Sequence, residues 1–152
     1  MKRLTVAVCC LCLLPFAMTL QAAEEQIDID AMTVPQLRGE IEKIEKDVYR
    51  VFNLRTPDES LHVTCHMYTP TGSNISREAC EPNFLIEARS RNARAYQDGF
   101  DELLDTDGLL AETSTDFDRF NAAMEALNEE YDYFRELNII LAILRGRLEE
   151  IR

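Results

Sequence analysis

The sequence lacks the short motifs by which most catalytic sites are recognised. Only 5 of the 152 residues are glycine, and they form neither a glycine-rich phosphate loop nor the elbow of a nucleophilic serine. No motif places a nucleophile beside a base, although the 28 acidic residues leave room for carboxylate pairs. We therefore expect a protein without catalytic residues or a cofactor, and an enzyme is the least favoured alternative.

Histidine is scarce, which limits the metal sites that the chain can form. His62 and His66 are the only two histidines, and on a predicted strand they lie about 13 Å apart at about 3.3 Å per residue, too far to share one metal ion. Cys65 and Cys80 could serve as thiolate ligands only in the reduced state. The sequence predicts no metal site.

Apolar runs are short everywhere except at the N-terminus. A basic start precedes an apolar run over 5–20, which Pro15 interrupts, and Ala22 or Ala23 offers a small-residue cleavage site. These features predict a secretory signal peptide over 1–23, with an uncleaved anchor as the alternative. We expect a flexible arm over 24–32 and no membrane span in the mature chain, because the remaining apolar runs are too short to cross a bilayer.

Basic residues are outnumbered by acidic ones. The chain has 16 Lys and Arg against 28 Asp and Glu, a net charge of −12. Loss of Lys2 and Arg3 with the signal peptide leaves 14 against 28, a net charge of −14. A field of this sign excludes nucleic acid as a partner that is bound through overall charge. It indicates either plain solubility or a cationic protein partner.

Three segments have the periodicity of amphipathic helices within a single predicted domain over 33–152. The first runs from a capping box at Thr33 to about Leu54, and the second follows Pro82. The third starts near Ser114 and keeps a heptad-like apolar stripe, typical of a coiled coil, to the end of the chain, with one slip around Phe134. About 36 residues at about 1.5 Å each give a length of about 54 Å, which exceeds the roughly 36 Å diameter of a compact domain of this size.

One stretch of the last predicted helix, LNIILAIL at 137–144, is apolar at every position except Asn138. A surface helix needs only an apolar stripe, so this stretch is predicted to be covered on more than one side. The cover is either intramolecular, between the first helix and the cysteine hairpin, or a homodimer seam or partner groove. The candidate interaction face consists of Leu137, Ile140, Leu141, Leu144 and Leu148.

The two cysteines outside the N-terminus bracket a predicted β-hairpin over 61–80. Alternating residues before a Thr-Pro-Thr-Gly-Ser-Asn turn indicate a strand. If Gly72 and Ser73 form a two-residue type II′ turn, Cys65 faces Cys80, because both pairs of positions sum to 145. Facing residues in a ladder lie within disulfide range. In an exported chain we therefore expect a Cys65–Cys80 disulfide that staples the hairpin.

The pattern Cys-x4-Pro-Thr-Gly-Ser-Asn-Ile-x4-Cys-x-Pro resembles a module of uncharacterised small exported proteins of proteobacteria. The resemblance covers about 20 residues. It implies export to the periplasm and a disulfide hairpin, and it implies no activity. The module often has Arg where this chain has His66 and Asn74, which weakens a binding role for the loop. The matching positions are Cys65, Pro70, Thr71, Gly72, Ser73, Asn74, Ile75, Cys80 and Pro82.

The sequence therefore predicts a mainly α protein with three helices, the last one long, and a disulfide-stapled hairpin between the first two. The favoured function is an exported, periplasmic or secreted, non-enzymatic interaction or structural module that self-associates through its C-terminal helix. The partner is an unknown protein or a second copy. The alternatives are an acidic inhibitor or chaperone-like binder of a cationic periplasmic protein and, least favoured, a small envelope enzyme.

Overall fold

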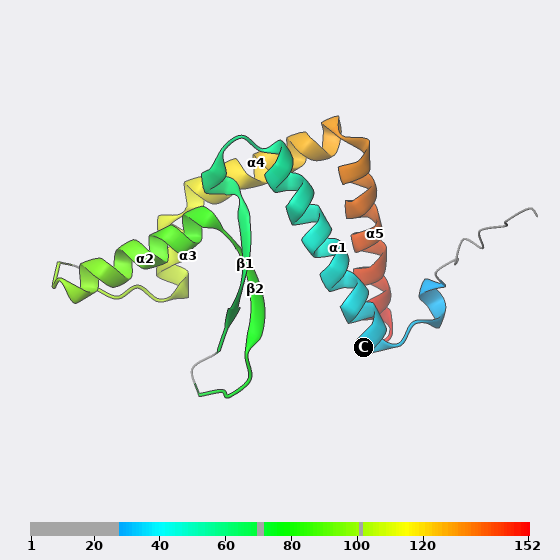
Figure 1. The fold of residues 1–152 in the computed structure, drawn as a ribbon, viewed down its shortest axis with the longest axis horizontal. Coiled ribbons are helices and arrows are strands. Elements are labelled where there is room, and N and C mark those ends of the chain that lie inside the picture. Colours follow the sequence, from blue (N-terminus) through cyan, green and yellow to red (C-terminus); the bar gives the residue numbers. More distant parts are fainter. Residues whose placement is uncertain (1–27, 70–71, 101) are drawn as a thin grey trace, which may run out of the picture.

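The computed structural model describes residues 28–69, 72–100 and 102–152 (Figure 1). The predicted signal peptide over 1–23, residues 24–27 of the predicted arm, and the turn residues Pro70 and Thr71 lie outside the described residues. The rest of the arm contains a short 3₁₀ helix, η1 (Ile29–Ala31). Ile29 and Met32 pack against the core, so this part of the arm is attached to the body of the protein.

The first helix begins where the sequence predicts. Helix α1 spans Val34–Arg55, with Pro35 in its first turn, and the Thr33 N–H donates to Gln36 Oε1 at 2.9 Å in a capping box. This arrangement satisfies backbone donors that have no partner within the helix. Its apolar face supplies much of the core, through the buried residues Leu37, Ile41, Val48, Val51 and Phe52.

The hairpin pairs in the predicted register. Strand β1 (Val63–Tyr68) runs antiparallel to β2 (Arg77–Pro82), Cys65 faces Cys80, and the two cysteines form a disulfide. The bounds differ slightly from 61–80 because a 3₁₀ turn, η2 (Glu59–Leu61), precedes β1. Asp58 caps that turn by accepting the Ser60 N–H at 3.0 Å, and it also forms an ion pair with Arg119, far along the chain.

The protein is mainly helical, but the predicted count of three helices is wrong. Five α-helices are present in the described residues: α1 is followed by α2 (Asn83–Gln97), α3 (Thr106–Glu112), α4 (Ser114–Glu130) and α5 (Asp132–Glu150). Helix α3 starts in an Asp-rich segment, because Asp105 caps this helix by accepting the Gly108 N–H at 2.9 Å.

The predicted long C-terminal helix is interrupted at Tyr131, whose backbone is extended (φ −121°, ψ 105°). Upstream, α4 packs its aromatic rings on the core, with ring centroids of Phe120 and Phe52 at 5.2 Å. Downstream, α5 returns alongside α1 (Figure 1). A straight helix could not make both contacts, since it would carry the leucines of α5 away from α1. The break coincides with the slip in the apolar stripe.

The elements form two helical arms joined by α4 (Figure 1). One arm is the α1–α5 pair, the other is α2 with α3, and the β1–β2 ribbon lies between them. The core runs along α1, α4 and α5 and includes Leu61 and Phe84, which lie just before β1 and just after β2 at the base of the ribbon. No helix in the described ranges is long and apolar enough to cross a membrane.

Candidate functional site

The inner face of α5 belongs to the core. Leu137, Leu141 and Leu144 are 3–6% exposed, and Leu148 is partly buried against the same cluster. These four residues of the candidate interaction face are therefore covered within one chain, by α1, α4 and η1. Figure 1 shows α1 between α5 and the β1–β2 ribbon, so the hairpin does not cover α5, contrary to one of the two alternatives predicted for its cover.

The outer face of α5 is apolar as well. Ile139, Ile140 and Ile143 are 53%, 40% and 51% exposed, and we call these three residues the outer isoleucine face. Ile140 is the one member of the predicted interaction face that is found here. The all-round apolar character of LNIILAIL therefore has two causes: leucines that pack on α1 and isoleucines that point to solvent.

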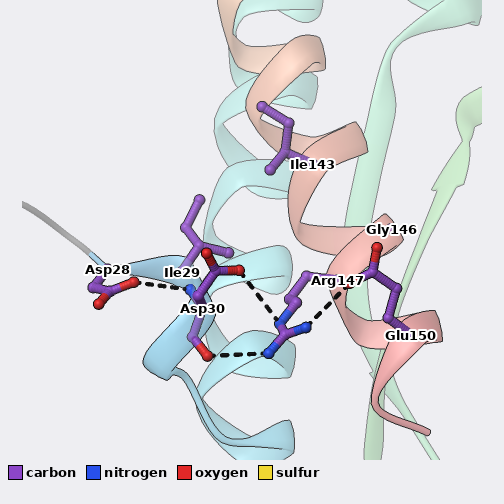
Figure 2. Close-up of a pocket in the computed structure, with 7 residues that line it drawn as sticks. All are labelled: Asp28, Ile29, Asp30, Ile143, Gly146, Arg147 and Glu150. Atoms are coloured by element: carbon purple, nitrogen blue, oxygen red, sulfur yellow. Dashed lines mark hydrogen bonds and ion pairs between the residues drawn. The ribbon is translucent and has the colours of Figure 1, made fainter.

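A hollow opens where the outer isoleucine face meets η1 (Figure 2). We call it the α5 hollow, and its volume is about 920 Å³. Ile143 and Ile29 are its apolar members, and Gly146 leaves a gap, because a Cβ at this position would meet no atom within 4 Å. The lining residues are Asp28, Ile29, Asp30, Ile143, Gly146, Arg147 and Glu150.

The charges in the α5 hollow are mostly negative. Arg147 is the one cation of the lining; it donates to the Asp30 backbone oxygen at 3.1 Å and to Glu150 Oε2 at 3.1 Å (Figure 2). Its Nε lies 3.8 Å from Asp30 Oδ1. With Asp28 there are three carboxylates against one guanidinium, a net charge of −2 for the lining. The hollow thus combines apolar walls with an acidic rim.

A second group of polar residues lies on the ribbon face toward α2. Arg89 donates to both carboxylate oxygens of Glu81, at 2.7 and 2.9 Å, and His66 Nε2 lies 3.5 Å from Glu81 Oε2. The bonds from Arg89 lower the pKa of the Glu81 carboxyl although partial burial opposes the shift, and they raise the pKa of Arg89. A carboxylate engaged in this way is a weak base. The group therefore holds the ribbon to α2 as an ion pair.

The hairpin connection carries the remaining predicted residues. The strands pair as far as Tyr68 and Arg77, so the connection is longer than the predicted two-residue turn. Gly72 has φ +81°, which favours glycine, and the Ile75 N–H donates to Ser73 Oγ at 3.0 Å. Asn74 is exposed. No cluster of three or more His, Cys, Asp or Glu side chains in the described segments could hold a metal ion.

Two asparagine side chains bond backbone groups that lie outside the regular hydrogen-bond ladders, and no sequence motif marks these residues. Asn53 on α1 donates to the Val63 backbone oxygen at 2.9 Å and accepts the Val63 N–H at 2.8 Å, as a neighbouring strand would. Asn92 on α2 makes the same pair of bonds to the Glu102 oxygen and the Leu104 N–H, both at 2.9 Å. Single asparagines at such positions carry no periodic signal, so only the fold reveals their role.

No protein-family model matches the chain, and no curated protein or solved structure matches it. The function must therefore be argued from the site itself. The resemblance of 65–82 to the exported hairpin module stays a hypothesis.

Proposed function

We propose that this protein is an exported, non-enzymatic interaction module that binds a cationic protein partner through the outer isoleucine face and the α5 hollow. The observation that carries the proposal is the pairing of exposed isoleucines with an acidic hollow on a single helix. A basic amphipathic helix has the complementary surface, with apolar residues for the isoleucines and Lys or Arg for the carboxylates.

The exposure of the isoleucines supports a binding role. Exposed apolar residues scattered singly are ordinary, whereas a contiguous patch rimmed by polar groups is typical of an interaction site. Ile139 and Ile143 lie four positions apart, so they are neighbours on the helix surface. Ile143 also lines the α5 hollow, which makes the apolar patch continuous with the carboxylates of Asp30 and Glu150.

A partner of opposite charge is favoured over a second copy at this face. A stable protein interface buries about 800 Å² on each partner, more than three half-exposed isoleucines provide, so charge complementarity must contribute to binding at this face. Two exported copies, each with a net charge of −14 after loss of Lys2 and Arg3, repel one another, while a cationic partner is attracted and steered to the surface.

Export is supported by the disulfide. Cys65 and Cys80 occupy facing positions and are bonded, and such bonds persist in oxidising compartments such as the periplasm. A thiol-labelling experiment on cell fractions tests this part of the proposal. Protein in the periplasmic fraction should resist alkylation until it is reduced, and a chain found in the cytosol with both thiols reactive would contradict export.

The binding part is tested with a synthetic helical peptide that has leucine on one face and lysine on the other. Isothermal titration calorimetry should detect binding that weakens as salt is added, because salt screens charge pairs at the surface. A peptide with glutamate in place of lysine should not bind. Binding of both peptides alike would contradict the proposal.

Two variants locate the binding surface. Ile143→Ser should weaken binding of the lysine peptide about tenfold, since it removes roughly one buried aliphatic side chain from the contact. Leu103→Ser is the matched control, because Leu103 is 60% exposed on the other arm and lies outside the hollow. Equal affinities for the two variants would place the binding site elsewhere. The same two variants can be compared in periplasmic cross-linking. A partner that binds at α5 should be captured by Leu103→Ser and lost with Ile143→Ser.

A further inference from the structure

The backbone groups of the ribbon alternate between its inner and outer sides. The Asn83 N–H, next to β2, donates to the backbone oxygen of His62, next to β1, at 2.8 Å. The backbone N–H and C=O of Val63 instead bond to the side chain of Asn53. Even-numbered residues of β1 therefore bond to β2, and odd-numbered residues direct their N–H and C=O outward. Cys65 and Met67 are the next outward residues, and no hydrogen bond from the described chain reaches these outward groups.

The two edges of the ribbon differ in protection. Strand β2 has Arg77, Glu78 and Glu81 and ends in Pro82, and charges and proline are the devices that keep a strand edge from pairing with another chain. Strand β1 has the sequence Val-Thr-Cys-His-Met-Tyr, without acidic residues, lysine, arginine or proline. The exposed edge of the protein that lacks such protection is therefore that of β1.

Asn53 sets the limit of the free edge. Its amide already bonds both outward groups of Val63, so an added strand can pair only from Cys65 toward the hairpin tip. The disulfide at Cys65, the first residue of this free edge, holds β1 extended before any partner arrives, which reduces the entropy lost on pairing.

We propose that β1 pairs with β1 of a second copy, antiparallel about a two-fold axis at Met67, to form a four-stranded sheet. In this register Met67 faces its own counterpart and the two exchange both backbone hydrogen bonds, while Cys65 faces Thr69 of the other copy. Val63 and Asn53 are left outside the pairing. The contact is self-complementary, as a two-fold interface must be.

The apolar residues at the two ends of the edge support a second copy as the occupant. Leu54, which lies beside Val63 and Cys65 at the base of the ribbon, is 74% exposed, and Ile75 at the tip is 67% exposed. Antiparallel pairing brings the tip of one copy toward the base of the other. Thr69 and residues 72–76, the described part of the tip, are uncharged, so two copies can approach there in spite of their net charge.

This interface is separate from the outer isoleucine face and goes beyond the proposed function. The two predictions respond to salt in opposite ways. Added salt should strengthen the β1–β1 dimer, because it screens the repulsion between two acidic chains, whereas it should weaken binding of a cationic partner to α5. Failure of one proposal can therefore be told from failure of the other.

The test uses sedimentation equilibrium on the intact oxidised protein and two proline variants of the same rung. Met67→Pro removes the outward N–H of β1, and Glu78→Pro removes the outward N–H of β2 directly opposite. Neither N–H belongs to the ribbon's own ladder, and proline is tolerated at such edge positions. The wild type and Glu78→Pro should dimerise with rising concentration, and Met67→Pro should stay monomeric.

Amide hydrogen exchange of the wild type gives a second measurement that needs no variant. The amides of Cys65 and Met67 should become protected as the concentration rises, and those of Glu78 and Cys80 on the other edge should not. A strict monomer at every concentration and salt level would overturn the proposal. A dimer that Met67→Pro leaves intact, or one without protection of Cys65 and Met67, would equally overturn it.

Discussion

Removal of the Cys65–Cys80 disulfide is the most informative perturbation of the fold. The ribbon that it closes begins after Leu61 and ends before Phe84, both of which are 5% exposed in the core. The folded chain therefore holds the base of the ribbon, where its two strands begin and end, without the bond. For this reason we expect the bond to act mainly on the unfolded state, by restricting a loop whose ends are 15 residues apart.

The magnitude follows from the loop length. A closed loop of this size is worth about 3 kcal/mol in the chain-entropy treatment, a large share of the roughly 5–15 kcal/mol that stabilises a small protein. For a chain of this length, that loss should lower the melting temperature by roughly 10 °C. Packing of the ribbon against α1 should change little, since alanine fits where the half-buried cysteines lie.

The assay is urea denaturation of Cys65→Ala/Cys80→Ala, followed by the circular dichroism of the helices. The variant should unfold at lower urea with about 3 kcal/mol less stability, and wild type in reductant should behave like the variant. If oxidised wild type and variant unfold at the same urea concentration with the same slope, the bond does not constrain the unfolded chain and the reasoning fails. Loss of the helical signal in the variant without urea would show that the ribbon is needed to fold the helices.

Three further variants probe the packing and the charges. Phe134→Ala, at a fully buried side chain just after the break at Tyr131, should cost about 3–5 kcal/mol in urea denaturation. Asn53→Ala should cost about 1–3 kcal/mol, because both backbone groups of buried Val63 lose their partner, and the exchange of the Val63 amide should quicken. The pKa of Glu81 is lowered in the folded protein, so its pair with Arg89 stabilises the fold at pH values above the unfolded pKa of 4.5, and this contribution is lost as the pH falls through the folded pKa. Arg89→Gln should abolish this pH dependence of the free energy of unfolding. An unchanged pH dependence in the variant would contradict the pairing.

Local patterns predicted the parts of the fold that depend on neighbours in sequence. The capping box at Thr33 located the start of α1, because its partners are three residues apart. The positions of Cys65 and Cys80 around a glycine turn predicted their pairing, since a hairpin register depends only on counting outward from the turn. The predicted two-residue turn was too short, but the predicted pairing of the strands was correct, because the longer connection is symmetric about the same centre.

The same periodicity could not predict where the last helix breaks. The stripe from α4 into α5 is nearly continuous, and a break at Tyr131 is favoured only because α5 then packs along α1. That return places Leu137, Leu141 and Leu144 inside and Ile139, Ile140 and Ile143 outside. The leucines lie on the predicted stripe and the isoleucines lie off it, but all six residues are apolar, so the sequence alone could not show that the isoleucines stay exposed.

What the sequence by itself determined is the chemistry of local pairs: the helix caps, the hairpin register, the disulfide and the acidic charge. What only the tertiary structure decided is which surfaces remain free. Asn53, ten residues away from Val63 in sequence, bonds both outward backbone groups of that residue. The rest of the β1 edge, from Cys65 onward, is left free. The α5 hollow exists because η1 returns to Arg147 from the opposite end of the described chain. Such contacts depend on how distant segments meet, and no periodicity within a single segment encodes that.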